Sequence, residues 1–355
     1  MFARLRLGLP LLVAISLVAS LACARGAAPT AGGAASSTGP AGEANAVATA
    51  ELVPIKIAFS QVAAAFAPIW IAHEHGYLKK YGLDAEVVNL SKPTDIQALL
   101  SGDVQITVDG SAAVEPIAGG ANLTYIAVPL PVYTQAVYGQ PPLQTLGDLV
   151  GKTVGATSQG GSSDNALRTL LAREGIDPTQ LNITYLRDDA GILAALQTGA
   201  VQAAILTSPN MLRAREMGLR EIVDTTPLKL RTINTGIIVR KDWAQQHPEL
   251  VEGFLKAYIE ASHEAKTQPE STKAIISKRT QLEDQALLDE AYRNSAAGWV
   301  VYPMPRDADI QNVIDRSAGA EVRAYPPSYY YDSSYLQKLE SFARNLDPTS
   351  VAAGQ

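Results

Sequence analysis

A loop of small residues before a predicted helix is the part of the sequence best suited to hold a charged group. In the segment SQGGSSDNAL, Gly160 and Gly161 lack a Cβ, so their backbone allows close approach of a ligand. Ser162 and Ser163 supply hydroxyl donors, and the helix that follows adds N–H groups and the positive end of its dipole. Together these groups suit an oxygen of a sulfonate, carboxylate or phosphate. The alternative is that Ser162 or Ser163 is simply the helix N-cap.

Small and polar residues also follow three other predicted strands, at the end where a parallel sheet binds its ligand. The segments are Ser60 and Gln61, then Asp109, Gly110 and Ser111, and finally Thr207 and Ser208. Asp109 suits a ligand amine or ring N–H, or it caps the helix predicted to start at Ala112. Trp70 is either an apolar wall of the same cleft or a core residue. We therefore expect these residues to surround one ligand site.

The sequence lacks the patterns typical of catalysis, metal binding or nucleic-acid binding. It has four histidines without an H-E-x-x-H pair and a single cysteine, so we expect neither a metal centre nor a cofactor. Gly160-x-Ser162 lacks the second glycine of a nucleophile elbow. A net charge of −6 without a basic stripe argues against a nucleic-acid partner.

The elements that must position these residues alternate between short apolar strands and helical patterns. This alternation, from Glu51 onward, is typical of βαβ units and a mainly parallel sheet. A short internal repeat, ALLSGDVQ and ALQTGAVQ, indicates two similar lobes. The sequence predicts an α/β protein with lobe 1 at 51–135 and 237–346, lobe 2 at 136–236, and a tail at 347–355.

The N-terminus is typical of a secretory signal peptide over residues 1–22. Two arginines precede an apolar run from Leu7 to Ala22, which is too short for a comfortable transmembrane helix. The next segment, 23–50, is nearly all Ala, Gly, Ser, Thr and Pro, and we expect a disordered tether there.

The only cysteine, Cys23, stands at the end of the apolar run. Its position resembles the lipobox of bacterial lipoproteins, although Ser20 stands where that pattern has Leu. We expect a lipidated Cys23 and an extracytoplasmic, membrane-anchored protein. The alternative is ordinary cleavage at Ala22-Cys23-Ala24, which would give a periplasmic or secreted protein.

Several segments, in order, resemble bacterial solute-binding proteins of the nitrate/sulfonate/taurine and thiamine-precursor group, which serve ABC importers. APIWIAHEHGYLKKYGLDAEVV is similar to the opening helix of that group, and GKTVGATSQGGSSDNALRTLLAREGIDP to the start of its second lobe. TGIIVRKDWAQQHPELVEGFLKAYIEASHEAKTQPE is similar to its return segment and C-terminal helices. The resemblance covers the chain from about Val53 to Leu346.

The resemblance implies a type II periplasmic-binding-protein fold with crossover strands near Pro131–Tyr138 and Thr235–Val239. It also implies a monomer that carries a small ligand of sulfonate, nitrate, carboxylate or pyrimidine type to an ABC permease. The alternative is an enzyme of pyrimidine or thiamine-precursor metabolism on the same fold. That branch uses a cysteine-rich motif and an active-site histidine, and this chain has no such motif.

Overall fold

The computed structural model describes residues 52–186, 189–317 and 319–352, which belong to one compact unit that begins at Ala50. The predicted signal peptide, Cys23 and the tether lie outside the described residues. None of the helices in the described part of the chain has both the length and the apolar content needed to cross a bilayer.

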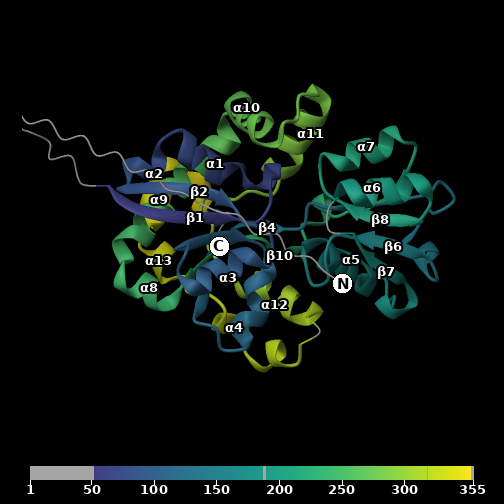
Figure 1. The fold of residues 1–355 in the computed structure, drawn as a ribbon, viewed down its shortest axis with the longest axis horizontal. Coiled ribbons are helices and arrows are strands. Elements are labelled where there is room, and N and C mark those ends of the chain that lie inside the picture. The colour runs from purple at the N-terminus through teal and green to yellow at the C-terminus, as the bar shows by residue number, and fades with distance from the viewer. Residues whose placement is uncertain (1–51, 187–188, 318, 353–355) are drawn as a thin grey trace, which may run out of the picture. The chain divides into compact units, whose positions relative to one another are not determined.

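Two five-stranded sheets form the centres of two lobes (Figure 1). The first has the order β2-β1-β3-β10-β4, and the second has the order β7-β6-β8-β5-β9. The first sheet comprises β1 Val53–Phe59, β2 Leu83–Asn89, β3 Ile106–Asp109, β4 Leu123–Val132 and β10 Arg231–Arg240. The second comprises β5 Ala136–Gly139, β6 Thr153–Ala156, β7 Asn182–Tyr185, β8 Ala203–Leu206 and β9 Arg220–Asp224. In each sheet one strand, β10 or β5, runs against its neighbours. The predicted two-lobe α/β fold is confirmed.

The internal repeat corresponds to the same hydrogen bonds in both lobes. Gln105 Oε1 accepts from the Lys56 amide at 2.8 Å, while its Nε2 donates to the Gly102 carbonyl at 3.0 Å. Gln202 accepts from the first amide of β6 and donates to the Gly199 carbonyl, both at 3.0 Å. Gly102 and Gly199 have φ of +88° and +75°, which favours glycine. The two glutamines therefore fix the turn from helix to strand in the same way.

The chain crosses between the sheets twice. The first crossover, residues 133–135, joins β4 to β5 within the predicted segment. The second joins β9 to β10 and ends before Arg231, so the predicted position at Thr235–Val239 is wrong. Residues 236–239 already pair with β3. The start of β10 escaped prediction because its first residues, RTIN, interrupt the apolar pattern with polar side chains, of which Asn234 lines the cavity between the lobes.

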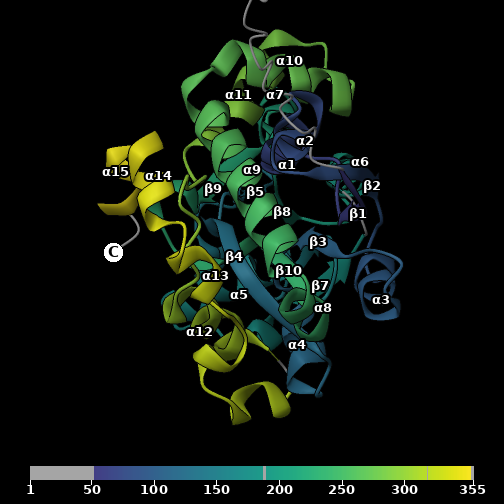
Figure 2. The same ribbon diagram turned by 90° about the vertical axis from the view of Figure 1, so that its left-hand side faces the viewer.

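Helices cover the sheets of both lobes, and the longest, α9, lies against α1 and α2 beside the first sheet (Figure 2). The helices that precede α8 are α1 Ala67–Glu74, α2 Tyr77–Lys80, α3 Thr94–Ser101, α4 Val114–Ala118, α5 Ser162–Arg173, α6 Asp189–Thr198 and α7 Asn210–Glu216. The later helices are α8 Lys241–Gln246, α9 Pro248–Thr267, α10 Pro269–Thr280, α11 Gln285–Ala296, α12 Asp307–Arg316, α13 Ser334–Gln337, α14 Glu340–Leu346 and α15 Pro348–Ala352. Helix α15 lies in the predicted tail, and its Val351 is buried.

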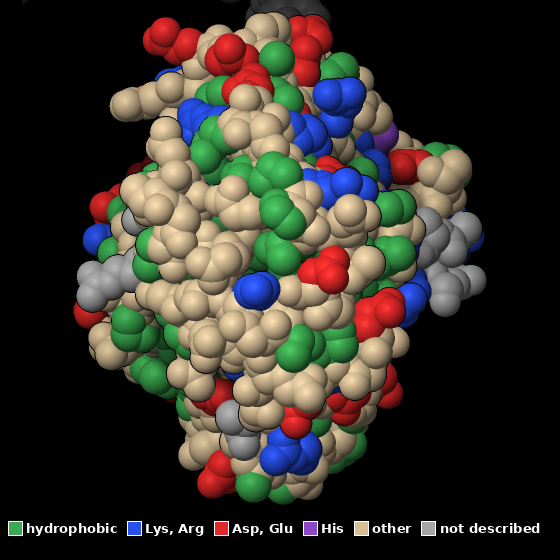
Figure 3. Space-filling view, turned by 90° about the vertical axis from the view of Figure 1, so that its right-hand side faces the viewer, with side chains coloured by type: hydrophobic (Ala, Val, Ile, Leu, Met, Phe, Trp, Pro, Cys, Tyr) green, Lys and Arg blue, Asp and Glu red, His purple; other side chains and the backbone are tan. Residues whose placement is uncertain are grey.

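The C-terminal helices also reach the second lobe. Helix α11 contacts α7, and α12 contacts α5. These contacts lie on opposite sides of the crossovers in Figure 1. On the face of the second lobe shown in Figure 3, acidic and basic side chains of the described residues are interspersed, and no charge of one sign dominates.

Candidate functional site

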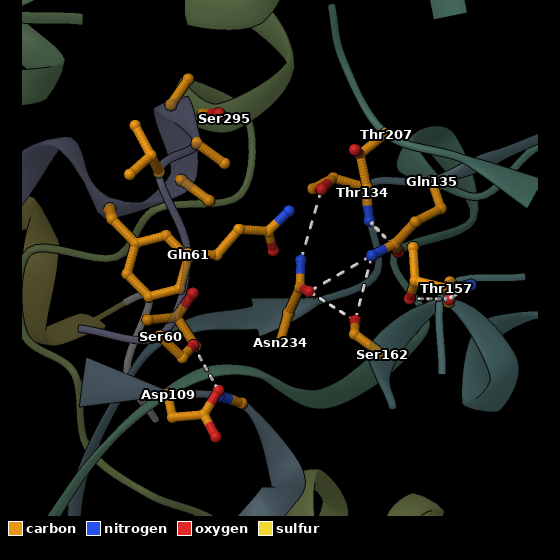
Figure 4. A pocket seen from close by; sticks show the side chains of 18 of the residues that line it. Ser60, Gln61, Asp109, Thr134, Gln135, Thr157, Ser162, Thr207, Asn234 and Ser295 are labelled. Atoms are coloured by element: carbon orange, nitrogen blue, oxygen red, sulfur yellow. Dashed lines mark hydrogen bonds between the residues drawn. The ribbon is translucent and has the colours of Figure 1, made fainter. Parts of the chain in front are cut away.

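A cavity of about 940 Å³ lies between the two lobes. It is lined by the ends of strands, by the first crossover, by Asn234 and Thr235 of β10 and by the first turn of α5, so groups from both lobes meet in it (Figure 4). The predicted site residues that line it are Ser60, Gln61, Asp109, Gly110, Ser162, Ser163, Thr207 and Ser208. The fold therefore brings eight of the twelve predicted residues to one cavity.

Trp70 and Ser111 do not line the cavity. Trp70 is fully buried in the core of the first lobe, where its ring meets that of Phe59 edge-on at 5.7 Å. Of the two alternatives for Trp70, a wall of the cleft or a core residue, the structure shows the core residue. Ser111 is buried behind the cavity, 3.5 Å from the side-chain amide of Asn165 on α5.

The glycine pair shapes the loop before α5 and also does not line the cavity. Gly160 has φ +69°, a conformation that side chains with a Cβ rarely adopt. Gly161 is the N-cap of α5, and a Cβ added to it would collide with Ser158. Neither Ser162 nor Ser163 is therefore the N-cap. The two glycines therefore shape the loop, and their predicted role in letting a ligand approach the backbone stays a prediction.

The two serines have different tasks. Ser163 fixes the loop, because its Oγ accepts from the Thr157 amide at 3.0 Å and lies 2.7 Å from the Thr157 hydroxyl. Ser162 points across the cavity floor. Its Oγ donates to Asn234 Oδ1 at 2.6 Å and accepts from Gln135 Nε2 at 3.0 Å (Figure 4).

An uncharged network of side chains links the first crossover to β10 and to α5 on the side of the cavity where α5 begins. Gln135 Nε2 also lies 3.3 Å from Asn234 Oδ1, and Asn234 Nδ2 donates to Thr134 Oγ1 at 3.3 Å. Sequence reasoning missed Thr134, Gln135 and Asn234. The available signal was the polar pair TQ within a segment already predicted to cross between the lobes.

A charged cluster occupies the opposite end, in the first lobe. Asp109 ends β3, and its Oδ1 accepts from the Ser60 hydroxyl and the Gly110 amide, both at 2.6 Å. Lys92 Nζ lies 3.0 Å from the same oxygen. Asp109 does not cap the following turn, whose N-cap is Gly110 without a side-chain bond. Sequence reasoning missed Lys92, which stands in the loop after β2.

Ser208 connects the cavity to the C-terminal helices. Its hydroxyl donates to Glu290 Oε1 on α11 at 3.1 Å, and Glu290 forms an ion pair with Arg215 on α7. Among the described residues no cluster of three or more His, Cys, Asp or Glu side chains is placed to hold a metal ion. The cavity therefore offers hydrogen bonds and one lysine–carboxylate pair, which are suited to holding a small polar molecule.

Comparison with known proteins agrees with this geometry. A family model described as NMT1/THI5 like matches residues 63–272. A Brucella abortus protein, named as a binding protein without a stated ligand, is 25% identical over 311 residues, covering 82% of this chain and 93% of its own. The taurine-binding periplasmic protein of Escherichia coli is 30% identical over 177 residues, covering 47% of this chain and 52% of its own.

A solved structure shows the same fold. The periplasmic aliphatic sulphonate binding protein SsuA from Escherichia coli superimposes with a TM-score of 0.60 at 25% identity, over 68% of this chain and 83% of its own. The names of these relatives describe binding proteins. The resemblance and the two-lobe periplasmic-binding-protein fold inferred from the sequence are thereby confirmed.

Proposed function

The chain belongs to the NMT1/THI5-like family, and we propose that it is a solute-binding protein that delivers a small organic anion to the permease of an ABC importer. One observation carries the proposal: hydrogen-bonding side chains from both lobes line a single cavity at the crossovers. A ligand in this cavity contacts both lobes, so its full set of hydrogen bonds needs both of them. Such a site serves capture and release without turnover.

Two features support an anionic ligand. The first turn of α5 lines the cavity with Ser162 and Ser163, and helix N-termini favour negative charge. Lys92 lines the opposite end. Val62 and Phe66 add apolar surface, and a volume of about 940 Å³ leaves room for an organic part beside the anionic group. These features support a sulfonate or carboxylate over bare nitrate.

We also propose that the lobes, divided at residues 133–135 and 225–230, close around the ligand as a monomer. A ligand shifts this equilibrium only by its differential affinity for the closed form. Small-angle scattering should show compaction at saturating ligand. An unchanged radius of gyration would contradict closure.

For its location, we propose an extracytoplasmic protein anchored by lipid on Cys23, supported by the signal-like N-terminus and the tether composition. Cys23→Ser should move the protein from the membrane fraction to the soluble extracytoplasmic fraction. Mass spectrometry should find acyl chains on the mature N-terminus of the wild type. A Cys23→Ser variant that stays membrane-bound to the same extent would refute the anchor.

The ligand proposal is tested by native mass spectrometry of the purified protein, followed by a thermal-shift screen with ethanesulfonate, taurine, nitrate, benzoate and pyrimidines. A ligand present at 100 times its Kd stabilises the protein by about 2.7 kcal/mol. We expect an organic sulfonate or carboxylate to give such a shift and to be recovered unchanged. Conversion of any compound, abolished by Asn234→Ala, would favour an enzyme instead.

A further inference from the structure

Three ionisable groups meet at the first-lobe end of the cavity. Asp109 is 1% exposed at the end of β3, and Asp95 is 0% exposed in the first turn of α3. Lys92 is 35% exposed, lines the cavity and contacts Asp109. A lysine that a ligand can reach thus pairs with Asp109, and a second buried carboxyl group, that of Asp95, lies close enough to feel both charges.

If both carboxyl groups are ionised, the cluster has fewer hydrogen-bond donors than carboxylate oxygens that need one. Asp109 Oδ1 is well supplied by Ser60, Gly110 and Lys92. Asp109 Oδ2 and both carboxylate oxygens of Asp95 receive no hydrogen bond of normal geometry from the described residues, although the Ile96 amide lies close enough to Asp95 to favour its ionised form. A buried oxygen without a donor costs free energy. One proton held between the two carboxyl groups supplies the missing O–H and removes the excess negative charge.

The surrounding charges agree with a shared proton. Burial, and after it the negative charge of Asp109, raises the pKa of Asp95 to about 7, and Lys92 acts in the opposite direction. The remaining titratable group that faces the pair is the phenol of Tyr125 on β4, whose pKa burial raises well above its usual value. Tyr125 is therefore neutral and donates to the Gly110 carbonyl at 2.8 Å. Of the groups in this cluster, Asp95 is therefore the one whose raised pKa lies near neutral pH.

We propose that Lys92 is a direct contact for the anionic ligand, and that Asp95 and Asp109 take up a proton when the ligand binds. An anion beside Lys92 competes with Asp109 for the ammonium group and adds negative charge next to the pair. A proton from solvent then converts the Asp95 carboxylate to the carboxylic acid, which donates to Asp109 Oδ2. This inference rests on the proposed function, because it assumes an anion in the cavity.

Proton uptake predicts that binding tightens as the pH falls. Because linkage allows at most a tenfold change in Kd per pH unit for each proton, ethanesulfonate should bind about 3–10-fold more tightly at pH 6 than at pH 8. Isothermal titration calorimetry of the purified protein at pH 7, in Bis-Tris, imidazole and Tris, should show uptake of about half a proton per ethanesulfonate bound. These buffers carry no sulfonate that would compete.

Variants at two positions, Asp95 and Lys92, separate the parts of the inference. Asp95→Asn should bind ethanesulfonate without proton uptake, since the Asn amide supplies the missing donor without titrating. Lys92→Met should lose about tenfold or more in affinity, as expected for a charged hydrogen bond, and Lys92→Arg should restore most of it. Lys152→Met, at an exposed lysine that does not line the cavity, is the matched control.

The outcomes distinguish this inference from the proposed function. Binding of ethanesulfonate without proton exchange, or with a pH dependence that survives in Asp95→Asn, overturns the inference alone. Affinity unchanged in Lys92→Met also overturns it. If neither ethanesulfonate nor any other anion of the screen binds, the proposed function and the inference fail together.

Discussion

The two ends of the cavity differ in their chemistry. The end at α5 is uncharged, and there Ser162 of the second lobe, Gln135 of the first crossover and Asn234 of β10 are already bonded to one another. The first-lobe end is ionic, with Lys92 and Asp109 in contact. One cavity therefore combines an uncharged set of hydrogen bonds at one end with a titratable, charged set at the other.

The difference has a physical consequence for recognition. Neutral hydrogen bonds depend on geometry and lose little when the pH or the salt concentration changes. A lysine–carboxylate pair beside a second buried carboxyl group responds to both. The uncharged end is thus expected to set the orientation of the ligand, and the ionic end to set how its affinity depends on conditions.

The largest effect on the uncharged end is expected from Asn234→Ala. This change removes the acceptor of Ser162 and a partner of Gln135, and it leaves both groups to find other bonds. A loss of about 2–3 kcal/mol would weaken binding by about 30–150-fold at any pH between 6 and 8. Asn182→Ala, at an exposed position on β7, is the control. A loss of affinity at only pH 6 or only pH 8 would contradict the proposed difference between the uncharged and ionic ends of the cavity.

A smaller effect is expected from Ser162→Ala. The lost hydroxyl contributes about 1–2 kcal/mol, so binding measured by calorimetry should weaken by about 5–30-fold. Ser101→Ala, an exposed serine at the end of α3, should bind as the wild type does. Wild-type affinity in Ser162→Ala would mean that the ligand does not use the first turn of α5.

The smallest expected effect concerns stability at the ionic end. The pKa of Asp95 is raised from 3.8 to about 7, so the folded state binds more protons than the unfolded state between these values. Stability then falls as the pH rises through this window. Asp95→Asn removes the titration and should raise the melting temperature at pH 8 by about 2–6 °C relative to the wild type. The gain should shrink towards pH 5, and a gain that is constant with pH would contradict the shared proton.

The sequence predicted much of the fold because periodicity and glycine positions report local structure. The helices and strands around Gly102 and Gly199 followed from this pattern. The start of β10 did not, because polar residues interrupt its apolar pattern. One of them, Asn234, lines the cavity. The same reason explains why Asn234 was missed.

The site residues that follow the ends of strands were predicted from the sequence. Those that only the tertiary structure brings to the cavity were missed. Ser60, Asp109 and Ser162 follow from topology alone. Lys92 and Gln135 stand in connecting segments, and only the folded chain brings them to the cavity. Trp70 shows the reverse case, since this predicted site residue lies on α1 and is fully buried in the core of the first lobe.

Hydrogen–deuterium exchange with and without the tightest-binding compound of the screen tests the central claim most directly. If one ligand bridges the uncharged and ionic ends, protection should appear together in residues 60–66, in residues 89–92 at the first-lobe end, and in residues 157–163 and 232–235 at the other. Asn234→Ala should lower the protection at both ends at equal ligand concentration. Protection confined to one lobe, or to a surface outside the cavity, would contradict the account.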